Sequence, residues 1–287
     1  MPLAVAVPPP AARRRPISLR VGLTVIGLAI AASTAMHLFQ IGQPNTPSFD
    51  SALLPPSLKH LFGTDNLGRD VFLRTIYATL TDVQIGAVAT GVPVLIGLAV
   101  GGAAGYLGGW VDAIVVRVFD FIMAFPLMVL VIAVLAVMGP GLAGVYVALI
   151  VKGVPIFGRL TRGELLALRE RPFILAAKTL GFSNRRILFR HALPHVVVPN
   201  LVLAVSDMLA NILLLAALSY LGLGVQPPTA EWGALIAAGQ PYLLTQWWLA
   251  TLPGLYVVAV GVGFSLTGEG CAELWRRRVG RGRGERV

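Results

Sequence analysis

Long apolar stretches with few or no charged residues are the feature that most constrains how this chain folds. The first of them, residues 21–41, contains 21 residues without a charged side chain. A helix needs about 20 apolar residues to cross the hydrocarbon core of a bilayer, where it satisfies its own backbone hydrogen bonds. Six such stretches predict an all-α polytopic membrane protein with transmembrane helices at residues 21–41, 83–107, 114–138, 142–157, 196–223 and 247–268.

Composition supports a membrane protein. The chain of 287 residues is 56% hydrophobic and 13% charged, which is more apolar surface than a soluble core of this size can hide.

Basic residues precede the first apolar stretch, so a cleaved signal peptide is the alternative interpretation of residues 21–41. The length of this stretch and the presence of later ones favour a retained helix. Residues 1–20, rich in Pro and Arg, predict a flexible cytoplasmic tail. Residues 271–287 predict a basic cytoplasmic tail that is either lipid-facing or disordered.

Several site chemistries are excluded by the residues themselves. Cys271 is the single cysteine, so the chain forms no internal disulfide and no cysteine-based metal site. The three lysines, Lys59, Lys152 and Lys178, do not follow a glycine, which excludes a GxxxxGK[ST] phosphate-binding loop. We therefore expect any ATP to be hydrolysed by another subunit.

The distribution of basic residues predicts the orientation. Of 23 Lys and Arg residues, four lie in residues 1–20, eight in residues 159–194 and six in residues 276–287. Six spans place these segments on one side, which the positive-inside rule identifies as the cytoplasm. Residues 42–82 and 224–246 are then external. The net charge of +10 is therefore explained by the basic residues of the cytoplasmic segments and does not indicate a nucleic-acid partner.

Ionisable residues within the apolar stretches are candidates for function, because charge at membrane depth is costly. Arg117 and Asp120, three residues apart, are expected either to pair with each other or to serve a gating or interface role. Lys152 either extends its ammonium group toward the inner interface or lines a polar pathway. Asp207 and Asn211 share a helix face, so they make an interhelical hydrogen-bonded contact or lie along a translocation path.

Two further features predict how the spans pack and end. Gly97, Gly101, Gly105 and Gly109 recur every four residues, a ridge that allows close helix packing. The span at 142–157 is short, and the amphipathic pattern after Arg159 predicts that its helix continues into the cytoplasm.

Residues 159–194 form the longest polar interruption in the chain. Apolar residues recur there with helical periodicity, which predicts short amphipathic helices separated by turns. Pro172 suits a first helical turn, Gly181 suits a turn with positive φ, and Pro194 can open the next helix. The pattern therefore predicts a helix, a tight turn and a second helix, followed by a membrane span. Such an arrangement can dock onto a partner protein.

Small residues and histidines add detail to this loop. Ala176 and Ala177, four and five positions before Gly181, are expected to let another protein approach closely. His191 and His195 have a spacing that can hold a metal, but no Glu or third ligand accompanies them, so we predict no metal site.

This loop resembles the EAA loop of ABC-importer permease subunits, in which a cytoplasmic coupling helix sits in a groove of an ATPase subunit. The family's usual Glu is replaced by Leu175, and His191 replaces a common apolar position. Arg185 and Arg186 are expected to help recruit the ATPase by charge. The residues on the family pattern are Ala176, Ala177, Gly181, Leu193 and Pro194.

The external residues 42–82 contain the string HLFGTDNLGRDVFLRTIY. Taken alone, it predicts a solvated loop that leads into an interfacial helix, with local ion pairs and caps. It also resembles the LGTDxLGRD signature of the dipeptide, oligopeptide and nickel permeases, and residues 216–233 are similar to a second segment of peptide permeases. The residues on the first signature include Gly63, Asp65, Gly68, Arg69 and Asp70.

The resemblance covers about residues 60–270 and implies a type I ABC importer permease fold, with residues 83–270 as the transmembrane domain. It implies half of a translocation pathway for peptides or a related small solute, in a bacterial plasma membrane, with both termini cytoplasmic. The implied partners are a homologous permease subunit, two cytoplasmic ATPases that use ATP and Mg²⁺, and an extracytoplasmic binding protein. The chain itself would be non-catalytic and bind no cofactor.

Two other classes of protein are alternatives. An ion-gradient-driven secondary transporter would use Lys152, Asp207 and Arg117 as coupling sites, but the chain lacks an evident inverted repeat and has a long polar loop of docking shape. An intramembrane hydrolase is disfavoured because neither HExxH nor GxSxG occurs.

Overall fold

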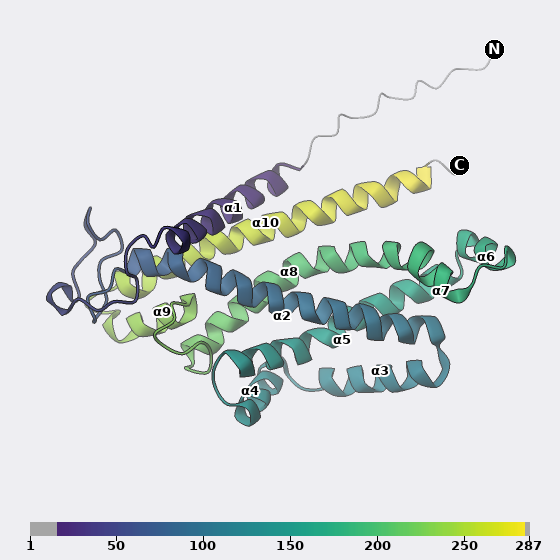
Figure 1. The fold of residues 1–287 in the computed structure, drawn as a ribbon, viewed down its shortest axis with the longest axis horizontal. Coiled ribbons are helices and arrows are strands. Elements are labelled where there is room, and N and C mark those ends of the chain that lie inside the picture. Colours follow the sequence, from purple (N-terminus) through teal and green to yellow (C-terminus); the bar gives the residue numbers. More distant parts are fainter. Residues whose placement is uncertain (1–15, 285–287) are drawn as a thin grey trace, which may run out of the picture.

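Apolar helices lie side by side in an elongated bundle (Figure 1). The computed structural model describes residues 16–284, with side chains as far as Arg277. Residues 1–15 of the predicted N-terminal tail and residues 285–287 of the C-terminal tail lie outside the described residues, whereas residues 271–284 continue α10 as helix. Residues 17–20 were predicted to belong to the flexible tail, but they form the first turn of a helix. The long helices are α1 (Ile17–Leu38), α2 (Val71–Leu107), α5 (Leu142–Arg169), α8 (Leu193–Tyr220) and α10 (Trp248–Gly284).

These helices pack in a fixed order. α2 makes its most extensive contact with α5 and also packs on α8, while α1 lies along α10 at the outer side of the bundle (Figure 1). Within the described residues, five helices are long and apolar enough to cross a membrane, and a bent pair of helices makes up to six. The prediction of an all-helical, multi-span protein is confirmed.

The bent pair corrects the prediction of one straight span at residues 114–138. α3 (Gly109–Met123) and α4 (Leu127–Met138) meet at 93°. Pro126, with φ of −54° and ψ of 134°, directly precedes α4. A proline has no N–H to donate to the preceding turn and disfavours the helical conformation of the residue before it, so the helix ends there and restarts in a new direction.

The start of α2 also differs from the prediction. α2 begins at Val71, twelve residues before the expected start at Val83, because Asp70 caps it: the carboxylate accepts a hydrogen bond from the Leu73 N–H at 2.8 Å. The expected interfacial helix is therefore the first part of the span itself.

The glycine ridge brings α2 and α5 into close contact. A methyl group added at Gly101 would lie 2.2 Å from the carbonyl oxygen of Gly158 on α5, and one at Gly97 would lie 2.7 Å from the Gly158 nitrogen. The predicted ridge is thus confirmed for Gly97, Gly101 and Gly105. Gly109 does not belong to it, because it is the first residue of α3 and a methyl group there would meet nothing within 4 Å.

The basic loop lies at the end of the bundle where α10 ends, and the external segment lies at the opposite end (Figure 1). α5 runs unbroken to Arg169, as the amphipathic pattern predicted. After α6 (Pro172–Thr179), α7 (Asn184–Arg186) and a π-helical segment (Ile187–Ala192) pass without a break into α8. The predicted second loop helix is therefore the end of a membrane-spanning helix, and Pro194 lies inside that continuous run.

Candidate functional site

A polar cluster joins three helices in the middle of the bundle. The Lys152 ammonium group on α5 donates hydrogen bonds to Asp207 Oδ1 at 2.9 Å and to Asn211 Oδ1 at 2.8 Å, both on α8. The Asn211 amide donates to Asp207 Oδ2 at 2.8 Å and to Thr90 Oγ1 on α2 at 2.9 Å. Hydrogen bonds therefore connect α2, α5 and α8 across the bundle.

The cluster neutralises its own charge. The side chains of Lys152 and Asp207 are only 10% and 7% exposed, and each charge faces its opposite at hydrogen-bond distance. The expectation that Lys152 reaches toward the inner interface is therefore wrong: its ammonium group is held by α8. The predicted interhelical contact of Asp207 and Asn211 is confirmed. Thr90 was not singled out from the sequence, because a lone threonine in an apolar helix carries no distinguishing pattern.

Lys152 also lines an apolar hollow of about 240 Å³ at the bend between α3 and α4. Lys152 is the only ionisable residue of its lining, so the polar cluster reaches this hollow through Lys152. The other lining residues are Ile122, Met123, Phe125, Leu127, Leu130 and Ile156.

Ion pairs at the loop end of α3 differ from those expected. Asp120 pairs with Arg159 on α5 rather than with Arg117, and Arg117 forms no ion pair within residues 16–277. A second pair joins Asp112 to Arg162, with Nη2 and Oδ2 2.6 Å apart. Both pairs join α3 to α5. The two helices lie close enough that an arginine of α5 pairs with Asp120 in place of Arg117, its neighbour on α3.

The loop helix α6 ends in a well-defined turn. The Phe182 N–H bonds to the Ala177 carbonyl at 3.1 Å and the Gly181 N–H to the Lys178 carbonyl at 3.0 Å, which is the Schellman arrangement. Gly181 takes φ of +74°, in the left-handed region that glycine favours. The turn predicted at Gly181 is confirmed.

The two neighbouring alanines of α6 differ in burial. Ala177 is 5% exposed and packs with Leu165 and Ile187, so it does not offer a surface to another protein as expected. Ala176 is exposed. The helical period of 3.6 residues places Ala177 on the buried face of α6 with Ile174, whereas Ala176 lies on the exposed face.

Large apolar side chains remain exposed around this turn. Leu175 is 48% exposed, Leu180 72% and Phe189 64%. Arg185 and Arg186 are exposed as well, and the Arg186 guanidinium lies 4.1 Å from the centre of the Phe182 ring. At the start of α8, Leu193 is half-buried and Pro194 is exposed.

The two loop histidines contact aromatic rings. His191 stacks on Phe182 with ring centres 5.9 Å apart, and His195 lies 5.4 Å from Phe173. No group of three potential metal ligands occurs in the part of the chain that the structure describes.

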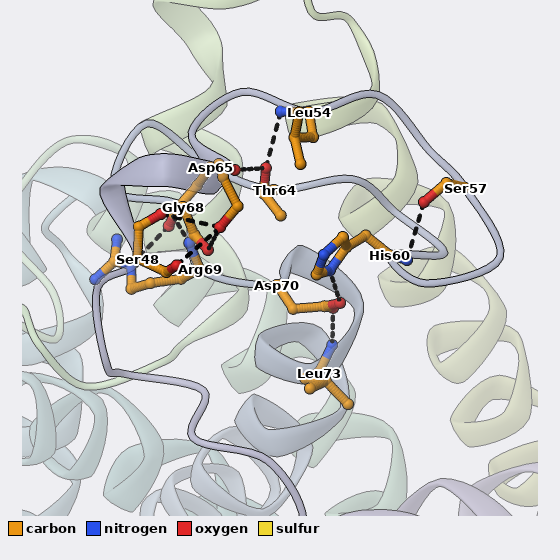
Figure 2. A network of polar contacts seen from close by, with 11 residues as sticks. Ser48, Leu54, Ser57, His60, Thr64, Asp65, Gly68, Arg69, Asp70 and Leu73 are labelled. Carbon is orange, nitrogen blue, oxygen red and sulfur yellow. Dashed lines mark hydrogen bonds and ion pairs between the residues drawn. The ribbon is translucent and has the colours of Figure 1, made fainter.

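The external signature builds a folded loop (Figure 2). Asp65 accepts hydrogen bonds from the backbone N–H groups of Leu67 and Arg69, both at 2.9 Å, and its second oxygen pairs with Arg69 Nε at 2.7 Å. Gly68 has φ of +73°, and a methyl group there would lie 1.7 Å from the Ser48 carbonyl oxygen. The local ion pair predicted from the sequence is confirmed.

The second half of the signature connects this loop to α2 (Figure 2). Asp70 caps α2 with one oxygen and pairs with His60 Nδ1 at 2.8 Å with the other. The Thr64 hydroxyl accepts from the Leu54 N–H at 2.8 Å and donates to the Ser51 carbonyl. Gly63 packs closely enough that a methyl group would lie 2.5 Å from the Leu54 carbonyl.

Two buried acidic residues fix the second external segment. Glu231 caps α9 (Trp232–Gly239), with its oxygens 2.8 Å from the N–H groups of Gly233 and Ala234. Asp82 on α2 accepts from the Trp232 N–H at 3.2 Å, and both carboxyl groups are fully buried. Sequence reasoning did not single out either residue, because their burial depends on a contact between positions about 150 residues apart.

The apolar helices, the internally neutralised polar cluster between them and the helical basic loop at one end define the class: a polytopic α-helical membrane protein. Residues 94–269 match the family described as binding-protein-dependent transport system inner membrane component. The chain belongs to this family, and it is a membrane-spanning permease subunit of a binding-protein-dependent ABC transporter.

The chain is similar over most of its length to curated permeases. It is 38% identical to the dipeptide transport system permease protein DppC of Alkalihalophilus pseudofirmus, over 86% of this chain and 83% of the relative. It is 38% identical to the probable D,D-dipeptide transport system permease protein DdpC of Escherichia coli, over 83% and 80%. It is 36% identical to the glutathione transport system permease protein GsiD of Pectobacterium atrosepticum, over 90% and 85%.

Proposed function

We propose that this chain forms one half of the translocation pathway of an ATP-driven peptide importer. A homologous permease subunit supplies the other half, two cytoplasmic ATPases bind ATP and Mg²⁺ and drive the cycle, and an extracytoplasmic binding protein delivers the solute. The chain itself is non-catalytic and binds no cofactor. Dipeptides are the favoured solute class, because relatives named for dipeptides and for glutathione match most of the chain.

The observation that carries this mechanism is the continuity of one helix. The residues from Asn184 to Tyr220 form a single run of 37 residues, with Arg185 at one end and Asp207 and Asn211 of the polar cluster further along. A displacement of the loop therefore moves the cluster as part of the same rigid element.

The exposed surface of the loop supports a docking role. Leu175, Leu180 and Phe189 are apolar and exposed, and the basic residues Lys178 and Arg185 of the same loop are exposed as well. An exposed apolar centre with a charged rim is typical of a protein interface. Leu175 occupies the position of the family's Glu and would contact the ATPase through apolar packing instead of a carboxylate.

The transport cycle follows from a difference in docking energy between two states. ATP closes the ATPase pair, the loop moves with it, and the spans exchange inward and outward access. The two states must differ in their docking free energy for this loop, since otherwise ATP shifts no equilibrium. The hollow that Lys152 lines, at the bend of α3 and α4, is our candidate for a surface of the pathway.

The loop, the start of α1 and the end of α10 are assigned to the cytoplasmic side of a bacterial inner membrane. The basic residues of residues 159–194 support this orientation through the positive-inside rule. The signature loop at residues 63–70 then faces the outside, where the binding protein docks.

ATP-dependent dipeptide uptake by the reconstituted transporter, with the loop turn altered at Gly181, tests this function. Gly181→Val should uncouple ATP hydrolysis from uptake, because a β-branched residue is strained at φ of +74°, although a Cβ atom at this position meets no neighbour within 4 Å. Gly181→Asn is the matched control, because asparagine tolerates this conformation, and it should retain uptake.

Uptake and ATP hydrolysis are measured in proteoliposomes with and without vanadate. Uptake that persists without ATP and stops when an ionophore dissipates the ion gradients would refute the proposal in favour of a secondary transporter. Normal coupling in Gly181→Val would remove the loop from the mechanism.

A further inference from the structure

A small hollow of about 80 Å³ lies at the end of the bundle opposite the basic loop. It is enclosed by the signature loop, the start of α2, the segment before α9, α9 itself and the start of α10. Its polar lining comes from Asp65, Asn66, Arg69, Arg74 and Thr229. The transport mechanism proposed above makes no use of this hollow.

Arg74 is the unusual residue of this lining. It is 4% exposed, yet its guanidinium forms no ion pair within residues 16–277. Its Nη1 donates to the Pro44 carbonyl at 2.9 Å and to Asn45 Oδ1 at 2.7 Å, which are neutral acceptors, and its Nε has no hydrogen-bond partner there. A buried charge without a counter-charge is costly, so this arrangement favours an anion that supplies the missing partner.

The remaining charges of the hollow do not supply that partner. Asp65 is occupied by Arg69, with Nε and Oδ2 2.7 Å apart, and by two backbone N–H groups. Two arginines therefore face one aspartate, which leaves one net positive charge in the lining. The walls formed by Val71, Leu235 and Leu249 are apolar and strengthen the electrostatic attraction of an anion.

The size of the hollow restricts the ligand. Pockets that hold a whole small-molecule ligand measure about 300–1,000 Å³. A hollow of about 80 Å³ admits a carboxylate group and its nearest carbon atoms but not a complete peptide. Guanidinium groups bind carboxylates through charge-assisted hydrogen bonds, so the geometry and the chemistry agree.

We propose that this hollow is a carboxylate-binding site on the external face of the permease, with Arg74 as its anchoring residue. The carboxylate is either the C-terminus of a delivered peptide or an acidic side chain of the binding protein. The site goes beyond the proposed pathway and rests on the proposed function only for which end of the bundle faces outside.

Cysteine labelling from the outside tests the sign of the charge in the hollow. Thr229→Cys is introduced into the full-length chain carrying Cys271→Ser, within the assembled transporter in proteoliposomes. Its rates with an anionic sulfonate and a cationic trimethylammonium methanethiosulfonate are compared with those of Leu244→Cys, a fully exposed control in the segment between α9 and α10. We expect the anionic-to-cationic rate ratio to be about fivefold higher at Thr229→Cys than at Leu244→Cys.

Variants at Arg74 link this preference to the proposed anchor. Arg74→Gln should reduce the ratio at Thr229→Cys to that of the control, whereas Arg74→Lys should retain most of it. Acetate should slow labelling at Thr229→Cys, and acetamide at the same ionic strength should not. Slowing by a dipeptide but not by its C-terminal amide identifies the peptide terminus, and slowing by the binding protein without peptide identifies an acidic side chain.

Two results overturn the proposal in distinguishable ways. If Leu244→Cys reacts from outside but Thr229→Cys shows no charge preference and no protection by acetate, the hollow holds only water and the carboxylate site is wrong. If neither cysteine reacts from outside, the orientation given under the proposed function is wrong, and the external site fails with it.

Discussion

At the scale of single residues, the ion pair of Lys152 and Asp207 is the contact on which the centre of the bundle depends. Both side chains are nearly buried, and each satisfies the other within 2.9 Å. Removing one partner of such a pair leaves an uncompensated charge, whereas removing both charges can be nearly neutral for stability.

Lys152→Met should therefore destabilise the folded protein by about 3–5 kcal/mol, measured by unfolding in detergent. The double variant Lys152→Met with Asp207→Asn should recover much of that loss, because no charge is then left unpaired. Equal stability of the single and double variants would show that the pair is not electrostatically coupled in the membrane protein.

At the scale of the elements, the contact between α2 and α5 determines how the bundle packs. Gly101 allows the two backbones to approach, since the space for a methyl group is already occupied by the Gly158 carbonyl. Two ion pairs between α3 and α5 then hold a third helix beside this pair. The hollow at the α3–α4 bend follows from that arrangement.

Gly101→Ala should cost about 1–3 kcal/mol of stability, because the added methyl group forces the helices apart. Gly91→Ala, on the same helix, is the matched control: a methyl group there meets nothing within 4 Å, so we expect no loss and a slight gain in helix propensity. Thermal unfolding of both variants in detergent measures the difference. A loss at Gly91→Ala equal to that at Gly101→Ala would rule out backbone contact as the cause.

At the scale of the whole molecule, the two ends of the bundle differ in their charged residues. The basic loop provides a surface that favours a partner of opposite charge, while the opposite end carries the folded signature loop. Screening by salt weakens attraction between exposed charges beyond about 8 Å at physiological ionic strength, so this attraction should depend on salt.

Arg185→Glu should weaken recruitment of the ATPase subunits several-fold at low salt and less at high salt, measured by co-purification and by binding to the reconstituted complex. Arg185 is a cleaner choice than Arg186, which also contacts the Phe182 ring. Lys59→Glu, an exposed change in the external segment, is the control and should leave recruitment unchanged. Equal recruitment by Arg185→Glu and the unaltered chain at every salt concentration would place Arg185 outside the interface.

The class of fold and several local structures could be predicted from the amino-acid sequence. Apolar length predicted the helical spans but not the bend between α3 and α4. The turn chemistry of Gly181 predicted the end of α6, and the spacing of Asp65 and Arg69 predicted their ion pair, because each depends on residues close together in the chain. The sequence also predicted that Asp207 and Asn211 make a polar contact, because residues four apart lie on the same face of a helix.

The contacts between residues far apart in the chain could not be predicted and depend on how the helices pack. Lys152 forms an ion pair with Asp207 of α8 instead of extending toward the interface. Asp120 pairs with Arg159 and not with Arg117, and Ala177 is buried. Periodicity tells which residues share one helix face, but not how that helix is rotated against its neighbours. Pairs separated by 39 or 55 residues in sequence become neighbours only when the helices pack, so their chemistry is fixed by the packing.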